Sequence, residues 1–289
     1  MSEDRHYNLT FPINFWGLMI RSIQIYRHTF LNYLTLAVIT YLPFLIFDQF
    51  SRFDLLDIVE FFHGNFLDVI VFLTLPTLLI EKKVFPISTI QLFFQRFFAS
   101  AVIISLVQLG ILLFFATFFA QISLGTIIIG IIPYIFLLFA GFFLIMENSP
   151  QLISVRRNLI NSVKLVKNQF FSIFWNYLNI TILLIVPLFV FSLWYLGRHT
   201  ELIQFVATIN DGQTPDTLKG QKLLTLIQSI VQEPGFKWSR ISIHILLRPI
   251  KSLFLALLFL GLLQPVKPDD IKSFLGVPED EPSVSKLDS

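Results

Sequence analysis

The sequence predicts an all-α membrane protein whose helices form a multi-pass transmembrane bundle. Of the 289 residues, 55% are hydrophobic and only 14% are charged, and phenylalanine alone occurs 34 times. A soluble domain of this length could not bury so much apolar surface. The apolar residues form continuous runs, and a helix needs about 20 of them to cross roughly 30 Å of hydrocarbon. A transmembrane β-barrel would instead show short alternating segments.

About six runs are long and apolar enough to be expected as spans. They cover residues 31–47, 62–80, 99–120, 124–146, 170–196 and 241–263. Prolines lie within or close to four of them, at Pro43, Pro76, Pro133 and Pro187. Membrane helices tolerate proline because neighbouring groups satisfy the freed carbonyls. We therefore expect kinked helices at these positions, not interrupted ones.

The distribution of lysine and arginine predicts the orientation of the spans. The proposed inner segments carry most of these residues, whereas the short outer loop 48–60 has one arginine and four acidic residues. The outer segment 197–240 holds five basic residues, but it is so long that the parts far from the membrane contribute less to the orientation. By the positive-inside rule, both termini are expected in the cytoplasm.

Three basic, partly apolar segments precede the first, third and fifth runs, at residues 13–30, 87–98 and 151–171. In the third, apolar residues recur every three or four positions, which places them on one helix face. The basic residues Arg156, Arg157, Lys164 and Lys167 lie elsewhere on that helix. This pattern is typical of an amphipathic helix at a membrane surface. A surface helix followed by two spans would then repeat three times; alternatively, the basic residues act only as topology signals.

The chain is expected to form one membrane domain with short flanking tails. Residues 1–12 are an N-terminal cytoplasmic tail, and residues 13–263 form the helical membrane domain with an outer helical insertion at 197–240. Residues 264–289 are rich in proline, serine and charge, which predicts a largely disordered cytoplasmic tail. An amphipathic stretch in the insertion, from Leu218 to Val231, is a candidate surface for a protein partner.

Three stretches carry a family resemblance. The stretch IIPYIFLLFAGFFLIMEN, with Pro133, is followed by NLINSVKLVKNQFF, with Ser162 and Leu165 beside Lys164 and Lys167. Together with YRHTFLNYLTL at 26–36, the chain resembles bacterial YciC-like inner-membrane proteins and the related membrane domain of glycerophosphodiester phosphodiesterases, over residues 13–196. The resemblance implies a six-helix protein of the bacterial plasma membrane. Tyr134 departs from it, because the family usually has glycine there.

Catalytic and metal-binding motifs are not found in the sequence. The five histidines are scattered without HExxH spacing, no cysteine is present, and there is no P-loop, GxGxxG or GxSxG motif. We expect no catalytic residue, no bound metal, no cofactor and no nucleic-acid partner. Asp54, Asp57 and Glu60 lie three residues apart and would either hold a divalent cation or be solvated.

The last run carries a cationic stripe. Arg240, His244, Arg248 and Lys251 follow at steps of four, four and three, which places them on one helix face. A charge near the centre of a bilayer costs about 2.5 to 3.5 kcal/mol, so such residues usually face a partner, a wet cavity or the interface. The stripe either lies along the outer surface or lines a groove that receives an anionic lipid headgroup or another phosphate-bearing ligand. Asp68 is a candidate countercharge for Arg248.

The composition and the stripe favour a non-enzymatic membrane protein that organises the membrane or binds lipids or a protein partner. A small transporter or permease component is the alternative. It would need a solvated path at mid-membrane, lined by groups such as Gln108, Asn176 and Arg248. Otherwise, Gln108, Asn176 and Asn179 make interhelical hydrogen bonds, each worth about 0.6 kcal/mol. An intramembrane lipid enzyme is a third hypothesis, for which no acid and base pair is visible.

Overall fold

The computed structural model describes residues 13–50, 56–81, 83–119, 132–146, 152–208 and 216–263. No strand occurs among these residues, and nearly all of them are helical, which confirms the predicted all-α fold class. The chain divides into two compact units. The first unit comprises Met1–Leu178 and Arg248–Ser289, and the second comprises Asn179–Leu247. The predicted tails, 1–12 and 264–289, lie outside the described residues.

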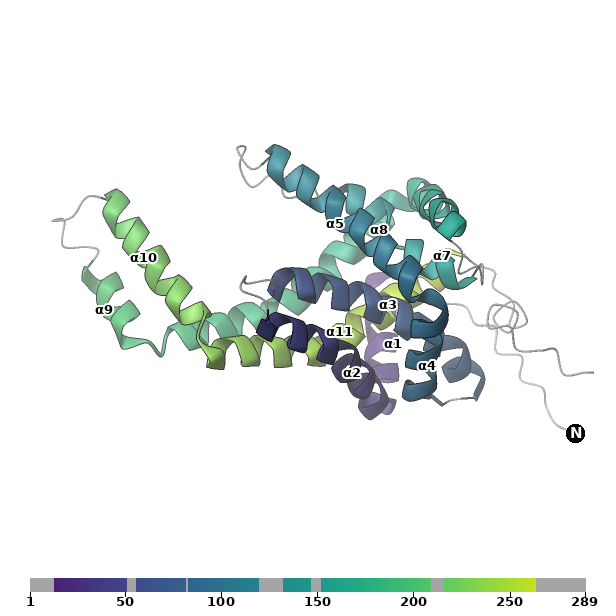
Figure 1. Ribbon diagram of the computed structural model, residues 1–289, viewed down its shortest axis with the longest axis horizontal. Coiled ribbons are helices and arrows are strands. Elements are labelled where there is room, and N and C mark those ends of the chain that lie inside the picture. The colour runs from purple at the N-terminus through teal and green to yellow at the C-terminus, as the bar shows by residue number, and fades with distance from the viewer. Residues whose placement is uncertain are drawn as a thin grey trace, which may run out of the picture. The chain divides into compact units, whose positions relative to one another are not determined.

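The helices follow one another along the chain as labelled in Figure 1. The first unit begins with α1 (Phe15–His28), α2 (Phe30–Phe50), α3 (Leu56–Glu81), α4 (Pro86–Leu92), the π-helix η1 (Phe93–Phe97) and α5 (Phe98–Phe119). After a shorter apolar helical segment, Ile132–Met146, which ends in α7 (Ala140–Met146), come α8 (Leu152–Leu196), α9 (Thr200–Thr208), α10 (Asp216–Val231) and α11 (Pro234–Leu262).

Within the described residues, four helices are long and apolar enough to cross a membrane, so this is a membrane protein. They are Ile58–Leu79, Pro86–Phe114, Ser154–Leu196 and Pro234–Leu262. A fifth span arises if α1 and α2, which meet at 88°, count as one broken span. The expected span at 124–146 is described only from Ile132, and tight backbone bonds such as Leu137 N–H to Tyr134 C=O form a turn within it. The count of six stays a prediction.

Two of the three predicted surface segments are separated from the following span by a backbone break. At Thr29, between α1 and α2, the backbone N–H and the side-chain hydroxyl both donate to the carbonyl of Ile25. Within α8, Gln169 has non-helical dihedral angles (φ −132°, ψ 27°), and this kink separates the basic half of the helix from its apolar half. The middle segment instead continues from α4 through η1 into α5.

Helix α3 lies at the centre of the first unit, where it packs against α2, α4, α5 and α7. Gly141 allows α7 to approach closely, since a Cβ there would lie 2.8 Å from Cγ2 of Val69. Phe72 stacks on Phe142 at 4.8 Å between ring centroids, and both rings contact Phe259 of α11. Every residue of α11 from Lys251 to Leu262 is buried. Burial of so many apolar side chains on α3 and α11 fixes where their few polar groups meet.

The second unit contains the apolar end of α8, the helices α9 and α10, and the first part of α11. Phe191 and Tyr195 of α8 pack on Phe236 of α11, with ring centroids 5.7 and 5.3 Å away. The Tyr195 hydroxyl donates to Glu233 Oε2 at 2.9 Å. The insertion predicted at 197–240 is therefore helical in its described part.

Prolines 43, 76 and 187 lie within helices that continue past them, as the sequence predicted.

Candidate functional site

A buried ion pair joins α3 to α11 in the first unit. Arg248 Nη2 donates to Asp68 Oδ2 at 2.9 Å, and the Ser252 hydroxyl donates to Asp68 Oδ1 at 2.6 Å. Because Ser252 lies one turn after Arg248, a single helix face supplies both donors. Asp68 is only 8% exposed, so each of its oxygens is satisfied from within the protein. The predicted countercharge for Arg248 is confirmed, and this arginine has a structural role.

Gly64 makes this arrangement possible. It lies one turn before Asp68 on α3, and a Cβ at that position would be 2.5 Å from Arg248 Nη2. The guanidinium therefore lies directly against the backbone of α3. His63, beside it, is fully buried, and its Nε2 lies 3.1 Å from the carbonyl oxygen of Ala37 and 3.2 Å from Thr40 Oγ1. These contacts fasten α2 and α11 to the same turn of α3.

Lys251, three residues after Arg248, is in a different electrostatic situation. It is 9% exposed, and its ammonium donates to the Tyr177 hydroxyl at 3.3 Å and lies 4.5 Å from the centroid of that ring. Within the described part of the chain, it forms no ion pair with a carboxylate. Because Asp68 is paired with Arg248, the Lys251 ammonium contacts the Tyr177 hydroxyl and ring but no described carboxylate.

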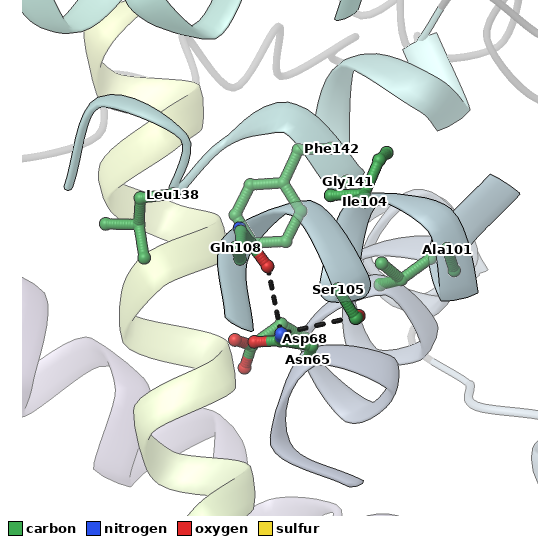
Figure 2. A pocket seen from close by; sticks show the side chains of 10 residues that line it. Asn65, Asp68, Ala101, Ile104, Ser105, Gln108, Leu138, Gly141 and Phe142 are labelled. Carbon is green, nitrogen blue, oxygen red and sulfur yellow. Dashed lines mark hydrogen bonds between the residues drawn. The ribbon is translucent and has the colours of Figure 1, made fainter. Parts of the chain in front are cut away.

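A small polar cavity adjoins Asp68, as Figure 2 shows. Its volume is about 20 Å³, which is room for a single water molecule. Asn65 Nδ2 donates to Gln108 Oε1 at 2.9 Å and to Ser105 Oγ at 3.4 Å, and Gln108 Nε2 donates to the carbonyl of Leu137 at 2.9 Å. Gln108 therefore joins α5 to α3 and to the turn within Ile132–Met146, as its predicted interhelical role requires.

The other two amides that were predicted to lie in the membrane, Asn176 and Asn179, have different surroundings. Asn176 Nδ2 donates to the carbonyls of Ile13 and Ser172, at 3.1 and 2.9 Å, so it joins α8 to the residue just before α1. Asn179 is exposed and belongs to the second unit. Asn176 therefore holds the apolar half of α8 near the start of the described chain.

The predicted stripe on α11 is shared between the two units. Arg240 and His244 are partly buried residues of the second unit, whereas Arg248 and Lys251 belong to the first. The structure thus brings Arg248 and Lys251 together around Asp68 and Tyr177. The sequence had no signal for Tyr177, Asn65 or Gly64, because their roles depend on how separate helices meet.

The basic half of α8 has the two faces that the sequence predicted. Arg156, Arg157, Lys164 and Lys167 are exposed, and no acidic residue occurs between Leu152 and Gln169. On the buried face, the Ser162 hydroxyl donates to the carbonyl of Phe136 at 2.8 Å and accepts from Phe139 N–H at 3.2 Å. Ser162 thus anchors the basic half of α8 to the turn within Ile132–Met146.

The predicted acidic trio lies largely outside the described side chains: Asp54 is not described, and of the other two only Glu60 has a described side chain. Among the residues that the structure describes, no three His, Asp or Glu side chains are placed to hold a metal ion.

In comparisons with known proteins, no protein-family model matches this chain, and no curated protein and no solved structure is significantly similar to it.

Proposed function

We propose that this membrane protein binds an anionic lipid whose phosphate is received by Lys251. The observation that carries the proposal is the buried ammonium of Lys251, which forms no ion pair with a described carboxylate. Arg248 is neutralised by Asp68, but the ammonium of Lys251 has only a tyrosine hydroxyl and an aromatic ring as described partners. A buried ammonium without a countercharge is costly, and a phosphate oxygen would offset that cost with a charge-assisted hydrogen bond.

The exposed basic face of α8 supports the same lipid class. The basic half of α8 carries four cations without an acidic residue among them, and each cation attracts an anionic leaflet by about 1 kcal/mol. This face would lie at the cytoplasmic surface of a bacterial plasma membrane in the orientation that the positive-inside rule predicts. Lys251 would then bind one lipid specifically, and the face formed by Arg156, Arg157, Lys164 and Lys167 would gather anionic lipids around the protein.

The polar side chains that could line a transport path are hydrogen-bonded within the protein, which favours a binding protein over a transporter. Gln108, Asn176 and Arg248 each make hydrogen bonds within the protein. The cavity beside Gln108 is the size of one water molecule. We propose a non-enzymatic lipid-binding role on this basis.

The proposal is tested by native mass spectrometry of the purified protein in mild detergent, with phosphatidylglycerol or phosphatidylcholine added. Lys251→Met should weaken binding of phosphatidylglycerol about tenfold, equivalent to about 1.4 kcal/mol, and leave phosphatidylcholine unaffected. Lys251→Arg should retain most of the binding, because the charge is kept. Lys83→Met, which removes an exposed lysine, is the matched control and should not change the ratio of the two lipids.

Thermal unfolding of the same variants separates binding from a purely structural role. Because Lys251 makes no ion pair with a described carboxylate, its replacement by methionine should not lower the stability of the lipid-free protein. Equal phosphatidylglycerol binding by Lys251→Met and the parent protein would contradict the proposal.

A further inference from the structure

A second concave site lies in the first unit, between α2, α3 and the start of α5. It is a groove of about 410 Å³, within the size range of pockets that bind small organic ligands. Six of the residues that line it are phenylalanines. The described lining consists of Thr40, Pro43, Phe44, Ile58, Val59, Phe62, Phe66, Phe93, Phe94, Phe98 and Val102.

The described walls of the groove offer a ligand no charge and almost no polar surface. Thr40 is the one polar residue in this described lining, and its hydroxyl donates to the carbonyl of Leu36 at 2.7 Å and lies 3.2 Å from His63 Nε2. That hydroxyl is therefore already satisfied by α2 and α3. A ligand with hydrogen-bonding groups would lose its own hydration here without compensation. The chemistry of the walls selects an apolar ligand.

Two departures from regular helix line the groove. Pro43 interrupts the hydrogen-bond ladder of α2, and the π-helix η1 carries Phe93 and Phe94. π-Helical turns are uncommon and frequently mark functional sites. Phe66 of α3 also lines the groove, with its ring centroid 5.6 Å from those of Phe93 and Phe98. Because these rings support one another, the groove is preformed.

All the lining residues belong to helices of the membrane-spanning class, namely Phe30–Ile46 in the bent pair, Ile58–Leu79 and Pro86–Phe114. We therefore expect lipid chains to reach the groove. We infer that it binds one acyl chain of a membrane lipid, held by the aromatic walls more firmly than the chains elsewhere on the protein surface. The inference does not depend on the phosphate site at Lys251, since none of the described lining residues is charged.

A phosphatidylcholine with a photoactivatable diazirine at mid-chain tests this site in reconstituted vesicles. Labelling of peptides that contain residues 58–66 and 93–102 should saturate as the mole fraction of the probe rises, because the groove holds a single chain. The exposed apolar face of α8, including Ile182, Ile185 and Val190, samples bulk lipid, and its labelling should rise in proportion to the probe.

Filling the groove should remove the saturable labelling. Val102→Trp is expected to lower it about tenfold, equivalent to about 1.4 kcal/mol, with unchanged labelling of α8. Ile58→Trp, at a 39% exposed position of the wall, gives a second variant that should fold even if Val102→Trp does not. Leu42→Trp is the matched control, because Leu42 is 47% exposed on α2 but does not line the groove.

The outcomes are distinct. Saturable labelling that persists in Lys251→Met and is lost in a filled variant supports the acyl-chain site, whether or not Lys251 binds phosphate. Labelling of the groove that rises in proportion to the probe, as on α8, would overturn it. Absence of labelling at the groove peptides would also overturn it, since the groove would then be closed to lipid, as it would be if a second copy of the chain covered it.

Discussion

Single polar residues decide how the apolar helices of the first unit meet. Asp68, Arg248 and Ser252 form a hydrogen-bonded cluster in which both carboxylate oxygens of Asp68 accept a hydrogen bond. An unpaired charge in such a cluster would be costly in hydrocarbon, so these contacts fix the position of α11 along α3. The sequence indicated this pair from the position of Asp68 near the outer start of its run. The sequence could not indicate that Lys251 would turn to Tyr177.

The first prediction for a single residue concerns Gly64. Gly64→Ala places a methyl group where Arg248 Nη2 now lies, so the guanidinium must move away from Asp68 or the helices must separate. We expect a destabilisation of about 1 to 3 kcal/mol, the usual range for overpacking a tight contact. Denaturant titration in detergent measures it. Gly110→Ala is the control: apart from the adjacent backbone of α5, no described atom lies within 4 Å of a Cβ built there, and it should be neutral or stabilise α5 by up to about 1 kcal/mol. Equal stability of Gly64→Ala and the parent would refute the proposed packing.

At the scale of elements, the prediction of helices from apolar runs succeeded because the runs are long and continuous. The basic segment 151–171 was expected to be a separate surface helix, and the break at Gln169 separates it from the apolar half of α8. The segment 87–98 differs, because α4 packs against α2 and α3 and continues through η1 into α5. Its phenylalanines have partners on α3, such as Phe66, and tertiary packing of this kind has no sequence signal.

Ser162 provides a test of how the basic half of α8 is attached. Its hydroxyl bridges the carbonyl of Phe136 and the N–H of Phe139, the two groups that face each other across the turn within Ile132–Met146. Ser162→Ala leaves the buried Phe139 N–H without this acceptor, which should cost about 1 to 3 kcal/mol. Hydrogen exchange of the amides at Phe139 and Ala140 should accelerate. Ser172→Ala, at an exposed position of the same helix, should leave both the stability and the exchange rates unchanged.

For the whole molecule, orientation is the prediction that follows from charge alone. The chain contains no cysteine, so single cysteines can be introduced without background. With both termini in the cytoplasm, an impermeant maleimide added to intact cells should label Ser51→Cys in the acidic loop but not Ser2→Cys or Ser289→Cys. All three should react after the cells are opened. Labelling of either terminus on intact cells would contradict the orientation. The resemblance to the YciC-like family also stays a prediction at this scale.

The sequence by itself determined that this chain is helical and embedded in a membrane, because burying 55% hydrophobic residues requires a lipid solvent and long apolar runs can satisfy their backbone there only as helices. It also located the cationic stripe on α11 and the basic face of α8. The tertiary structure alone decided that Lys251 meets Tyr177, how Gly64 admits Arg248 and where six phenylalanines form a groove. These features depend on distances between helices far apart in the sequence, and a periodic pattern records which face is apolar but not which partner that face meets.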